Sequence, residues 1–353
     1  MVNRYIYSIA NSGGRLYPAS VCLQMILEQK KDYYPIYKLE NISGHPYGWF
    51  YLNHLIVDKG EEIEISPGTE MTNSIKLACR VLGYNFEHCV TDEWNKILNF
   101  IKSKIQKNNP VILGPVAHCK LKYQISGLRA PAVASHYLVI VGYDEKFIYF
   151  HDPNGMSYIP FTYEQIRDVF TEQVKIPGSK RFSAITVEER YETPTEVEVF
   201  KRVIDNAIKS YEEKEVRFNG YVGLHAIQKY AEDIIKFLGA NNKSEKEMIL
   251  RKLALYFYPK GNQIRSDAIS YMNYISEYIP NIKDIIDNFC SVFMKASIIY
   301  KEDSELLMPK IVKFDEKDIE STLSILQKHA YKIYDLEKEA YKCIVKIKEE
   351  LKD

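Results

Sequence analysis

The feature that most constrains this chain is a pair of strand-like runs at residues 138–143 and 147–150, separated by the polar segment Asp144-Glu-Lys146. Both runs are rich in β-branched and aromatic residues, which favour strands, and the segment between them is typical of a turn. The sequence therefore predicts an antiparallel hairpin. A turn centred on this segment places His136, at the start of the first strand, opposite residues 152–154.

The open end of this hairpin carries side chains that suit acid–base chemistry. Asp152 or Asn154 can accept a hydrogen bond from one ring nitrogen of His136. Such a bond fixes the tautomer and stabilises the imidazolium that forms when the other nitrogen takes a proton. Pro153 and Gly155 end the second strand, so Asp152 is expected at a rim of the sheet. The structural alternative is a core histidine with satisfied hydrogen bonds beside a turn.

A cysteine near a helix start completes the pattern. Pro18 suits a first helical turn, and apolar residues recur after it at helical spacing, so Cys22 is predicted in that first turn. Free N–H groups and the positive end of the helix dipole favour a thiolate there, and the thiolate is the nucleophilic form. The alternative is that Cys22 is a small buried apolar residue. Taken with the hairpin, the pattern predicts a site of Cys22, His136 and Asp152.

Periodicity divides the chain into two parts, as its length of 353 residues also suggests. Residues 1–188 show helical patterns first and strand patterns later, which predicts an α+β domain with an antiparallel sheet. Beyond residue 188 the strand signals nearly vanish. Helical spacing then recurs at residues 196–210, 226–238, 245–256, 264–279, 282–299 and 319–351. We therefore predict an all-α domain at residues 189–353.

Composition excludes several classes of function. Lys+Arg and Asp+Glu both number 47, so nothing indicates a nucleic-acid partner. The six cysteines are scattered without a CxxC pair, which argues against a zinc site or a disulfide framework. The first residues lack the apolar segment of a signal peptide, and no apolar run is long enough to cross a bilayer. The expectation is a cytoplasmic protein with no membrane partner, no metal and no cofactor of its own.

The order Cys22, His136, Asp152 resembles the papain-like superfamily. The segment SHYLVIVGYDEKFIYFHDPNG is similar to the His–Asp hairpin of C39-like peptidases. The resemblance to the butirosin biosynthesis protein H family is closer, and it extends to the amide-forming enzyme of closthioamide assembly. Further segments similar to that family are GHPYGWFY and NNPVILGPV in the first half and, more loosely, GYVGLHAIQKYAEDI and GNQIRSDAISYMNYISE in the second.

The resemblance implies a papain-like (C39-like) domain that acts as an acyltransferase in antibiotic biosynthesis. Cys22 would be the nucleophile, His136 the general base and Asp152 the orienting acid, with Asn154 as the alternative third member. The acyl donor would be an acyl or peptidyl carrier protein bearing 4′-phosphopantetheine, and a small amine would accept the acyl group to form an amide. The helical domain would act as a lid, or as an acceptor or carrier-docking domain.

The chain departs from the pattern in two places. Val21 stands where many relatives have a histidine, and no glutamine precedes Cys22. An oxyanion hole would use the Cys22 backbone N–H plus another donor. Asn11 is the nearest upstream amide, and its alternative role is that of a turn former. Two other functions remain open: a cysteine peptidase or amidase of C39-like type, and a non-catalytic binding module.

Overall fold

The computed structural model describes residues 3–4, 17–57, 60–67, 71–124, 135–171, 179–213, 220–240, 243–313 and 316–351. The chain forms two compact units. Unit 1 comprises Met1–Leu39 and Met71–Thr193, and unit 2 comprises Glu40–Glu70 and Pro194–Asp353. Each unit is described by itself below.

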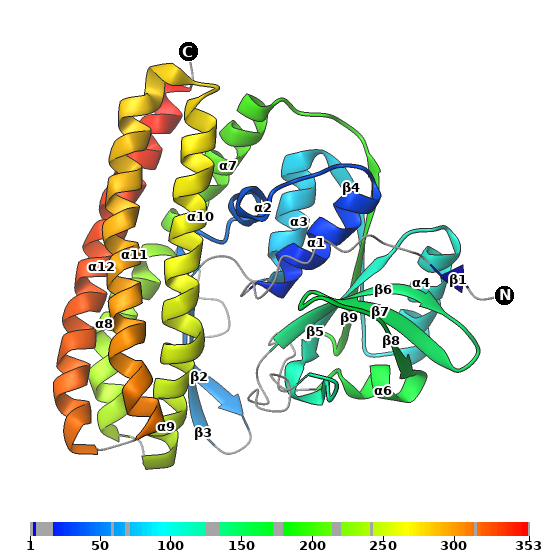
Figure 1. The fold of residues 1–353 in the computed structure, drawn as a ribbon, viewed down its shortest axis with the longest axis horizontal. Helices are drawn as coiled ribbons and strands as arrows, with labels where there is room; N and C mark the ends of the chain where they lie inside the picture. The colour runs from blue at the N-terminus through cyan, green and yellow to red at the C-terminus, as the bar shows by residue number, and fades with distance from the viewer. Residues whose placement is uncertain are drawn as a thin grey trace. The chain divides into compact units, whose positions relative to one another are not determined.

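Unit 1 is built on an antiparallel sheet in the order β4-β9-β5-β6-β7-β8, with β1 paired to β6 (Figure 1). Its strands are β1 (Asn3–Arg4), β4 (Tyr84–Thr91), β5 (Val111–Ala117), β6 (Ser135–Tyr143), β7 (Phe147–Asp152), β8 (Met156–Thr162) and β9 (Phe182–Arg190). Its helices are α1 (Pro18–Gln29), α3 (Met71–Leu82), α4 (Trp94–Gln106), η1 (His118–Lys120) and α6 (Tyr163–Asp168). Helix α2 (Ile36–Ile42) crosses the boundary into unit 2.

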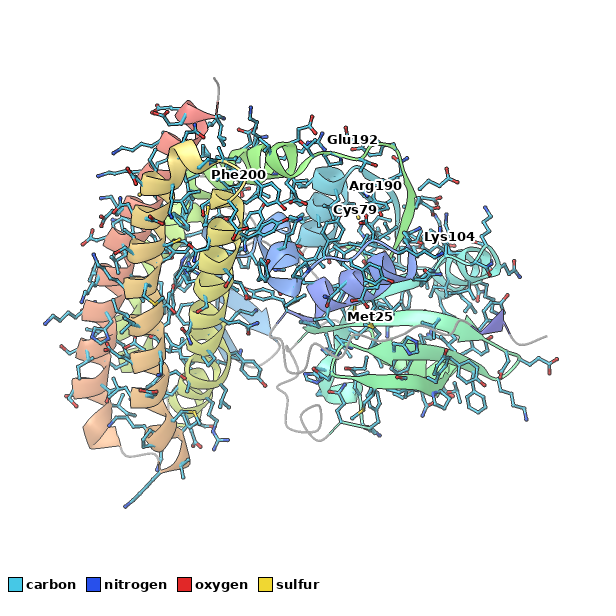
Figure 2. The ribbon with its side chains drawn as sticks, turned by 45° about the horizontal axis from the view of Figure 1, so that its top comes forward. Met25, Cys79, Lys104, Arg190, Glu192 and Phe200 are labelled. Carbon is cyan, nitrogen blue, oxygen red and sulfur yellow. The ribbon has the colours of Figure 1, made fainter. Side chains whose placement is uncertain are left out.

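The core of unit 1 joins α4 to the middle of the sheet. Ile97, Ile101 and Ile105 recur at helical spacing on α4, and they pack with buried residues of β5, β6 and β7 such as Leu138 and Phe150. Figure 2 labels Lys104 near the end of α4, a residue whose ammonium pairs with Glu87 of β4 and, at 2.7 Å, with Glu188 of β9. Apolar burial and this ionic pairing together fix α4 on the sheet.

The hairpin that holds the expected site is β6–β7. Its register pairs Val139 with His151 and Ile140 with Phe150, and an irregularity follows before Gly142. On its other edge β6 pairs with β5, where His136 faces Val116. A second irregularity lies between Leu113 and Val116, and a Cβ on Gly114 there would lie 2.5 Å from the ring of Tyr137. Glycine at that position therefore lets β5 approach β6 at the end that carries His136.

Unit 2 combines a helical bundle with a small sheet. Figure 1 shows α8, α10, α11 and α12 running side by side. The helices are α7 (Glu196–Glu212), α8 (Gly223–Ala240), α9 (Lys243–Lys252), η2 (Leu253–Phe257), α10 (Tyr258–Ser276), η3 (Pro280–Ile282), α11 (Lys283–Val312) and α12 (Glu316–Glu350). The strands β10 (Gly220–Val222), β2 (Trp49–Val57) and β3 (Gly60–Pro67) form an antiparallel sheet in that order.

The α+β class is confirmed, with an antiparallel sheet early in the chain and helices dominating later. The second half is not all-α, because Gly220–Val222 forms the strand β10 against β2. The expected boundary at residues 188/189 differs from that between the two units, which falls at Thr193/Pro194 and places residues 40–70 in the helical unit. The physical reason is strand pairing: β2 bonds to both β3 and β10, and this pairing joins residues 49–67 to the second half.

Candidate active site

Cys22 lies within the fully buried first part of α1. Pro18 is the first helical residue, and Cys22, the fifth, is 0% exposed. A regular helix that begins at Pro18 engages the N–H of Cys22 with the carbonyl of Pro18. Cys22 therefore follows the first turn rather than lying in it, and its backbone N–H is not one of the free donors at the helix start. The expected use of this N–H in an oxyanion hole does not fit this arrangement.

The environment of Cys22 favours a neutral thiol. Burial raises its pKa well above the usual value, and the negative charge of Asp152 raises it further. Burial and the charge of Asp152 raise the pKa of Tyr123, and Cys22 adds a smaller contribution. Cys22 is thus close enough to the end of β7 to interact with its carboxylate. Among the described residues, no hydrogen bond joins Cys22 to His136. A nucleophilic Cys22 must therefore lose its proton during the attack.

His136 and Asp152 are joined directly. Nε2 of the imidazole lies 3.0 Å from Oδ2 of Asp152, with His136 4% exposed and Asp152 0% exposed. Burial alone would raise the pKa of Asp152, but hydrogen bonds from His136 and Tyr123, the charge of His136 and the N–H of Asn154 outweigh it and lower that pKa. Asp152 is therefore an ionised acceptor. Because Nε2 is engaged, Nδ1 is the ring nitrogen left to exchange a proton with a thiol.

Asp152 is held by more groups than the sequence indicated. Its Oδ2 accepts from the hydroxyl of Tyr123 at 2.6 Å and from the side-chain amide of Gln124, and its Oδ1 accepts from the backbone N–H of Asn154 at 2.7 Å. The side chain of Asn154 donates to Gln124 Oε1 at 2.9 Å. Asn154 therefore supports Asp152 and Gln124, while Asp152 is the partner of His136.

His118 lies flat against His136. The two imidazole rings are stacked with centroids 4.6 Å apart and 10° between their planes, and His118 Nε2 lies 3.1 Å from Gln124 Oε1. Burial lowers the pKa of His118, and the charge of His136 lowers it further. A neutral His118 thus covers one face of the candidate base. No spacing rule predicted His118, Tyr123 or Gln124, because they follow β5 and reach the hairpin only through the fold.

Asn11, the expected oxyanion-hole candidate, and His151, the neighbour of Asp152, remain to be placed. Asn11 lies outside the described residues. His151 is buried beside Asp152, its Nδ1 accepts from the N–H of Tyr158 at 3.1 Å, and burial lowers its pKa to about 4. Strand alternation directs His151 and Asp152 to opposite faces.

In the described part of the chain, no group of three or more His, Cys, Asp or Glu could hold a metal ion, and no helix is long and apolar enough to span a membrane.

Parts of this chain are similar to a known family and to known proteins. Residues 68–175 match the model of the Peptidase_C39 like family. A Bacillus subtilis (strain 168) protein, YobF, named as uncharacterized, is 27% identical over 165 residues, which cover 46% of this chain and 53% of that protein. The chain thus aligns with about half the length of this curated relative. A Bacillus anthracis crystal structure described as a C39-like peptidase has a TM-score of 0.34 at 13% identity, covering 53% of this chain and 98% of the other.

The matched region contains His136 and Asp152 but begins after Cys22. Two observations connect Cys22 to the matched region. Helix α1 packs against β5 and β6, and the charge of Asp152 adds to burial in raising the pKa of Cys22. Residues 68–175 are thus similar to the Peptidase_C39 like family, and this similarity supports a papain-like cysteine enzyme in general.

Proposed function

We propose that the chain is a cysteine-dependent acyltransferase that forms an amide. The acyl group would move from a thioester to Cys22 and then to an amine. The observation that carries the proposal is the burial of Cys22, at 0% exposure, beside the His136–Asp152 pair of a C39-like domain. A buried acyl-enzyme is protected from water, so a bound amine has the advantage over hydrolysis.

The proposed first step begins from the neutral thiol. Sγ of Cys22 attacks the thioester carbonyl while its proton passes to Nδ1 of His136, and Asp152 stabilises the resulting imidazolium. The tetrahedral intermediate breaks its bond to the leaving sulfur, which takes the proton back from His136. The products are a thioester on Cys22 and a free thiol. This exchange is nearly isoenergetic, because one thioester replaces another.

The second step transfers the acyl group. A neutral amine attacks the Cys22 thioester, its nitrogen loses a proton to His136, and the C–S bond breaks. Cys22 leaves as a thiolate and recovers the proton from His136. An amide is more stable than a thioester, so this step runs downhill. The roles of His118, Tyr123 and Gln124 would be to keep the His136–Asp152 pair oriented.

The donor, acceptor and setting belong to the same proposal. The resemblance to the butirosin H family and to closthioamide assembly supports a carrier-protein donor bearing 4′-phosphopantetheine, a small amine acceptor and a role in antibiotic biosynthesis. A cytoplasmic setting would keep Cys22 reduced. The functions of the two domains expected from the sequence, catalytic for residues 1–188 and lid or docking for residues 189–353, are proposed on the same basis.

The family match favours a second candidate, a C39-like peptidase or amidase. It would use the same residues with a peptide as substrate and water as the acceptor. The two functions differ in what discharges the acyl-enzyme. They also differ in the donor, which is a thioester in one case and an amide in the other.

Intact-protein mass spectrometry can separate them. The wild type and Cys22→Ala would be incubated with a panel of N-acetylcysteamine thioesters and then with propylamine or buffer. Cys79→Ala is the matched control, because Cys79 is also a buried cysteine, on α3, and is labelled in Figure 2. The proposal expects an adduct on the wild type and Cys79→Ala that is absent from Cys22→Ala and is discharged faster by the amine. Failure across the panel, with peptides cleaved instead, would establish the peptidase.

A further inference from the structure

His118 is a second histidine of the candidate active site, and the proposed steps give it only an orienting role. Its imidazole ring is stacked on that of His136, with centroids 4.6 Å apart and 10° between the planes. His118 follows β5 at the start of η1 and is partly exposed, whereas His136 is buried. A second imidazole therefore lies directly on the candidate base and is partly open to solvent.

Hydrogen bonds assign the proton of the His118 ring. The amide nitrogen of Gln124 donates to the carboxylate of Asp152, which is an acceptor only, so the amide oxygen of Gln124 faces His118. That oxygen lies 3.1 Å from Nε2 of His118, and it also accepts from the side chain of Asn154 at 2.9 Å. An amide oxygen cannot donate, so Nε2 of His118 carries the hydrogen of the neutral ring. Nδ1 is then the unprotonated nitrogen, which can accept a proton.

The surroundings of His118 keep its ring neutral. Burial lowers the pKa of His118 and the charge of His136 lowers it further, against the bond to Gln124 and the charge of Asp152, which raise it. Two stacked imidazoles repel each other when both are protonated, so a proton taken by His118 has to leave before His136 takes one. The lowered pKa and the partial exposure of His118 let such a proton pass to water.

The second step of the proposed reaction needs an additional base. A simple alkylamine has a pKa near that of lysine, about 10.4, so fewer than about one molecule in a thousand is neutral at pH 7. The protonated amine must lose one proton before it can attack the Cys22 thioester, and its nitrogen loses another during the attack. His136 takes the second of these protons and returns it to Cys22. The first proton requires a different acceptor.

The other described groups around His136 are poorly suited to that first proton. Tyr123 donates its hydroxyl hydrogen to Asp152 at 2.6 Å, and burial and the charge of Asp152 raise the pKa of this tyrosine. Both oxygens of Asp152 accept hydrogen bonds, and although burial alone would raise its pKa, the bonds from His136 and Tyr123 lower it. His151 lies on the opposite face of its strand. Among the described residues of the site, His118 is the base that remains.

We propose that His118 is the base that deprotonates the incoming ammonium in the acyl transfer. Its Nδ1 takes one proton from the R–NH₃⁺ nitrogen, which leaves neutral R–NH₂, and the proton then passes from His118 to water. The neutral amine attacks the Cys22 thioester with His136 as its second base. The inference rests on the proposed acyl transfer, and it assigns His118 to the discharge of the acyl-enzyme by an amine and not to its formation.

Two substitutions of His118 remove the basic nitrogen, and each keeps one structural feature. His118→Phe keeps a flat ring against His136, and His118→Asn keeps an amide N–H that can donate to Gln124. Intact-protein mass spectrometry at pH 7 would follow the formation of the Cys22 adduct from an N-acetylcysteamine thioester and its discharge by propylamine. We expect both variants to form the adduct within about twofold of the wild-type rate, and propylamine to discharge it at least about tenfold more slowly.

His88→Phe is the matched control. His88 is a partly exposed histidine of β4 whose Nε2 lies 3.0 Å from the hydroxyl of Ser183, and burial lowers its pKa to about 4. It takes no part in the proposed chemistry, so this variant should match the wild type in both rates.

The basicity of the amine separates a base from a residue that only positions His136. 2,2,2-Trifluoroethylamine resembles propylamine in size but is neutral at pH 7, so it needs no base before the attack. With this amine both His118 variants should be discharged within about twofold of the wild-type rate, and with propylamine their deficit should shrink as the pH rises from 7 to 9.

The opposite results are equally distinct. Slow discharge by both amines, slow formation of the adduct as well, or discharge by propylamine at the wild-type rate would overturn the proposal for His118. Either His118 variant decides alone if the other does not fold. Absence of an adduct on the wild type across the thioesters would instead refute the acyl transfer itself, and the role of His118 with it.

Discussion

Replacing Asp152 with asparagine tests whether a single ionised carboxylate organises the candidate site. Oδ2 accepts from three donors, on His136, Tyr123 and Gln124, while Oδ1 accepts from the N–H of Asn154. An asparagine amide can offer its oxygen on one side only. With the oxygen in the Oδ2 position, three acceptances become neutral and the backbone N–H of Asn154 loses its partner. Hydrogen bonds to charged groups contribute about 1.5–3 kcal/mol and neutral ones about 1 kcal/mol.

The expected loss follows from these terms. Weakening three charge-assisted bonds by roughly 0.5–1 kcal/mol each and losing the part-buried bond from the N–H of Asn154, at about 0.5–1.5 kcal/mol, gives an upper range of about 2–4.5 kcal/mol. Relaxation and water reduce such losses, so we expect Asp152→Asn to lower the free energy of unfolding by about 2–4 kcal/mol at pH 7. Urea unfolding followed by circular dichroism measures it. Asp168→Asn, on the exposed end of α6, is the control and should change little.

The pH dependence has a defined sign. The pKa of Asp152 is lowered in the folded chain, so its stabilisation is fully present above the unfolded value, about 3.9, and is lost as the pH falls through the folded pKa. The difference in stability between wild type and Asp152→Asn should therefore be constant from pH 6 to 8 and shrink below about pH 4. A difference below 1 kcal/mol at pH 7, or one that grows on acidification, would refute the reasoning.

Three further changes test separate parts of the structure. Burial and the charge of Asp152 raise the pKa of Cys22, so the rate of its alkylation by iodoacetamide should rise about tenfold per pH unit from pH 6 to 9. Peptide mass spectrometry measures this rate, and a fast reaction at pH 6 would indicate a preformed thiolate. Gly83→Ala should cost about 2–4 kcal/mol in urea unfolding, since φ is +77° and the new Cβ would lie 2.4 Å from a backbone oxygen; an unchanged midpoint would contradict this. Arg265→Met should cost about 3–5 kcal/mol in urea unfolding, because it leaves the buried charge of Glu337 without its cationic partner and with only the hydroxyl of Tyr211 as a donor. Adding Glu337→Met should recover part of the loss, and a double variant less stable than the single one would count against this account.

Local pattern predicted much of the secondary structure. The hairpin of β6 and β7 was readable because its residues favour strands and the segment at Asp144 favours a turn. In the structure the Asp144 carboxylate accepts from the N–H of Lys146 at 2.8 Å, a turn-forming bond. The long helices of the second half were readable from apolar spacing. Strands β2, β3, β4 and β8 were not predicted. Polar and apolar residues are mixed in β3, β4 and β8, and β2, although rich in aromatic and aliphatic residues, pairs with β10 far along the chain.

The candidate active site was likewise only partly predictable from the sequence. The sequence singled out Cys22, His136 and Asp152 because each has a recognisable local setting. It misplaced Cys22 within the first turn, since a proline suits more than one position near a helix start. It could not identify Tyr123 and Gln124 as partners of Asp152, because they are separated from it by 29 and 28 residues and meet it only in space.

What the sequence determined by itself was therefore whatever depends on neighbours along the chain: the helical and strand periodicities, the turn at Asp144, and the chemical types of the candidate residues. What only the tertiary structure decided depends on distant residues brought together. This includes the pairing of β2 with β10, the assembly of donors around Asp152, and the burial that makes Cys22 a neutral thiol. The reason is physical: backbone preferences act over a few residues, whereas burial and hydrogen-bond partners are set by packing across the whole unit.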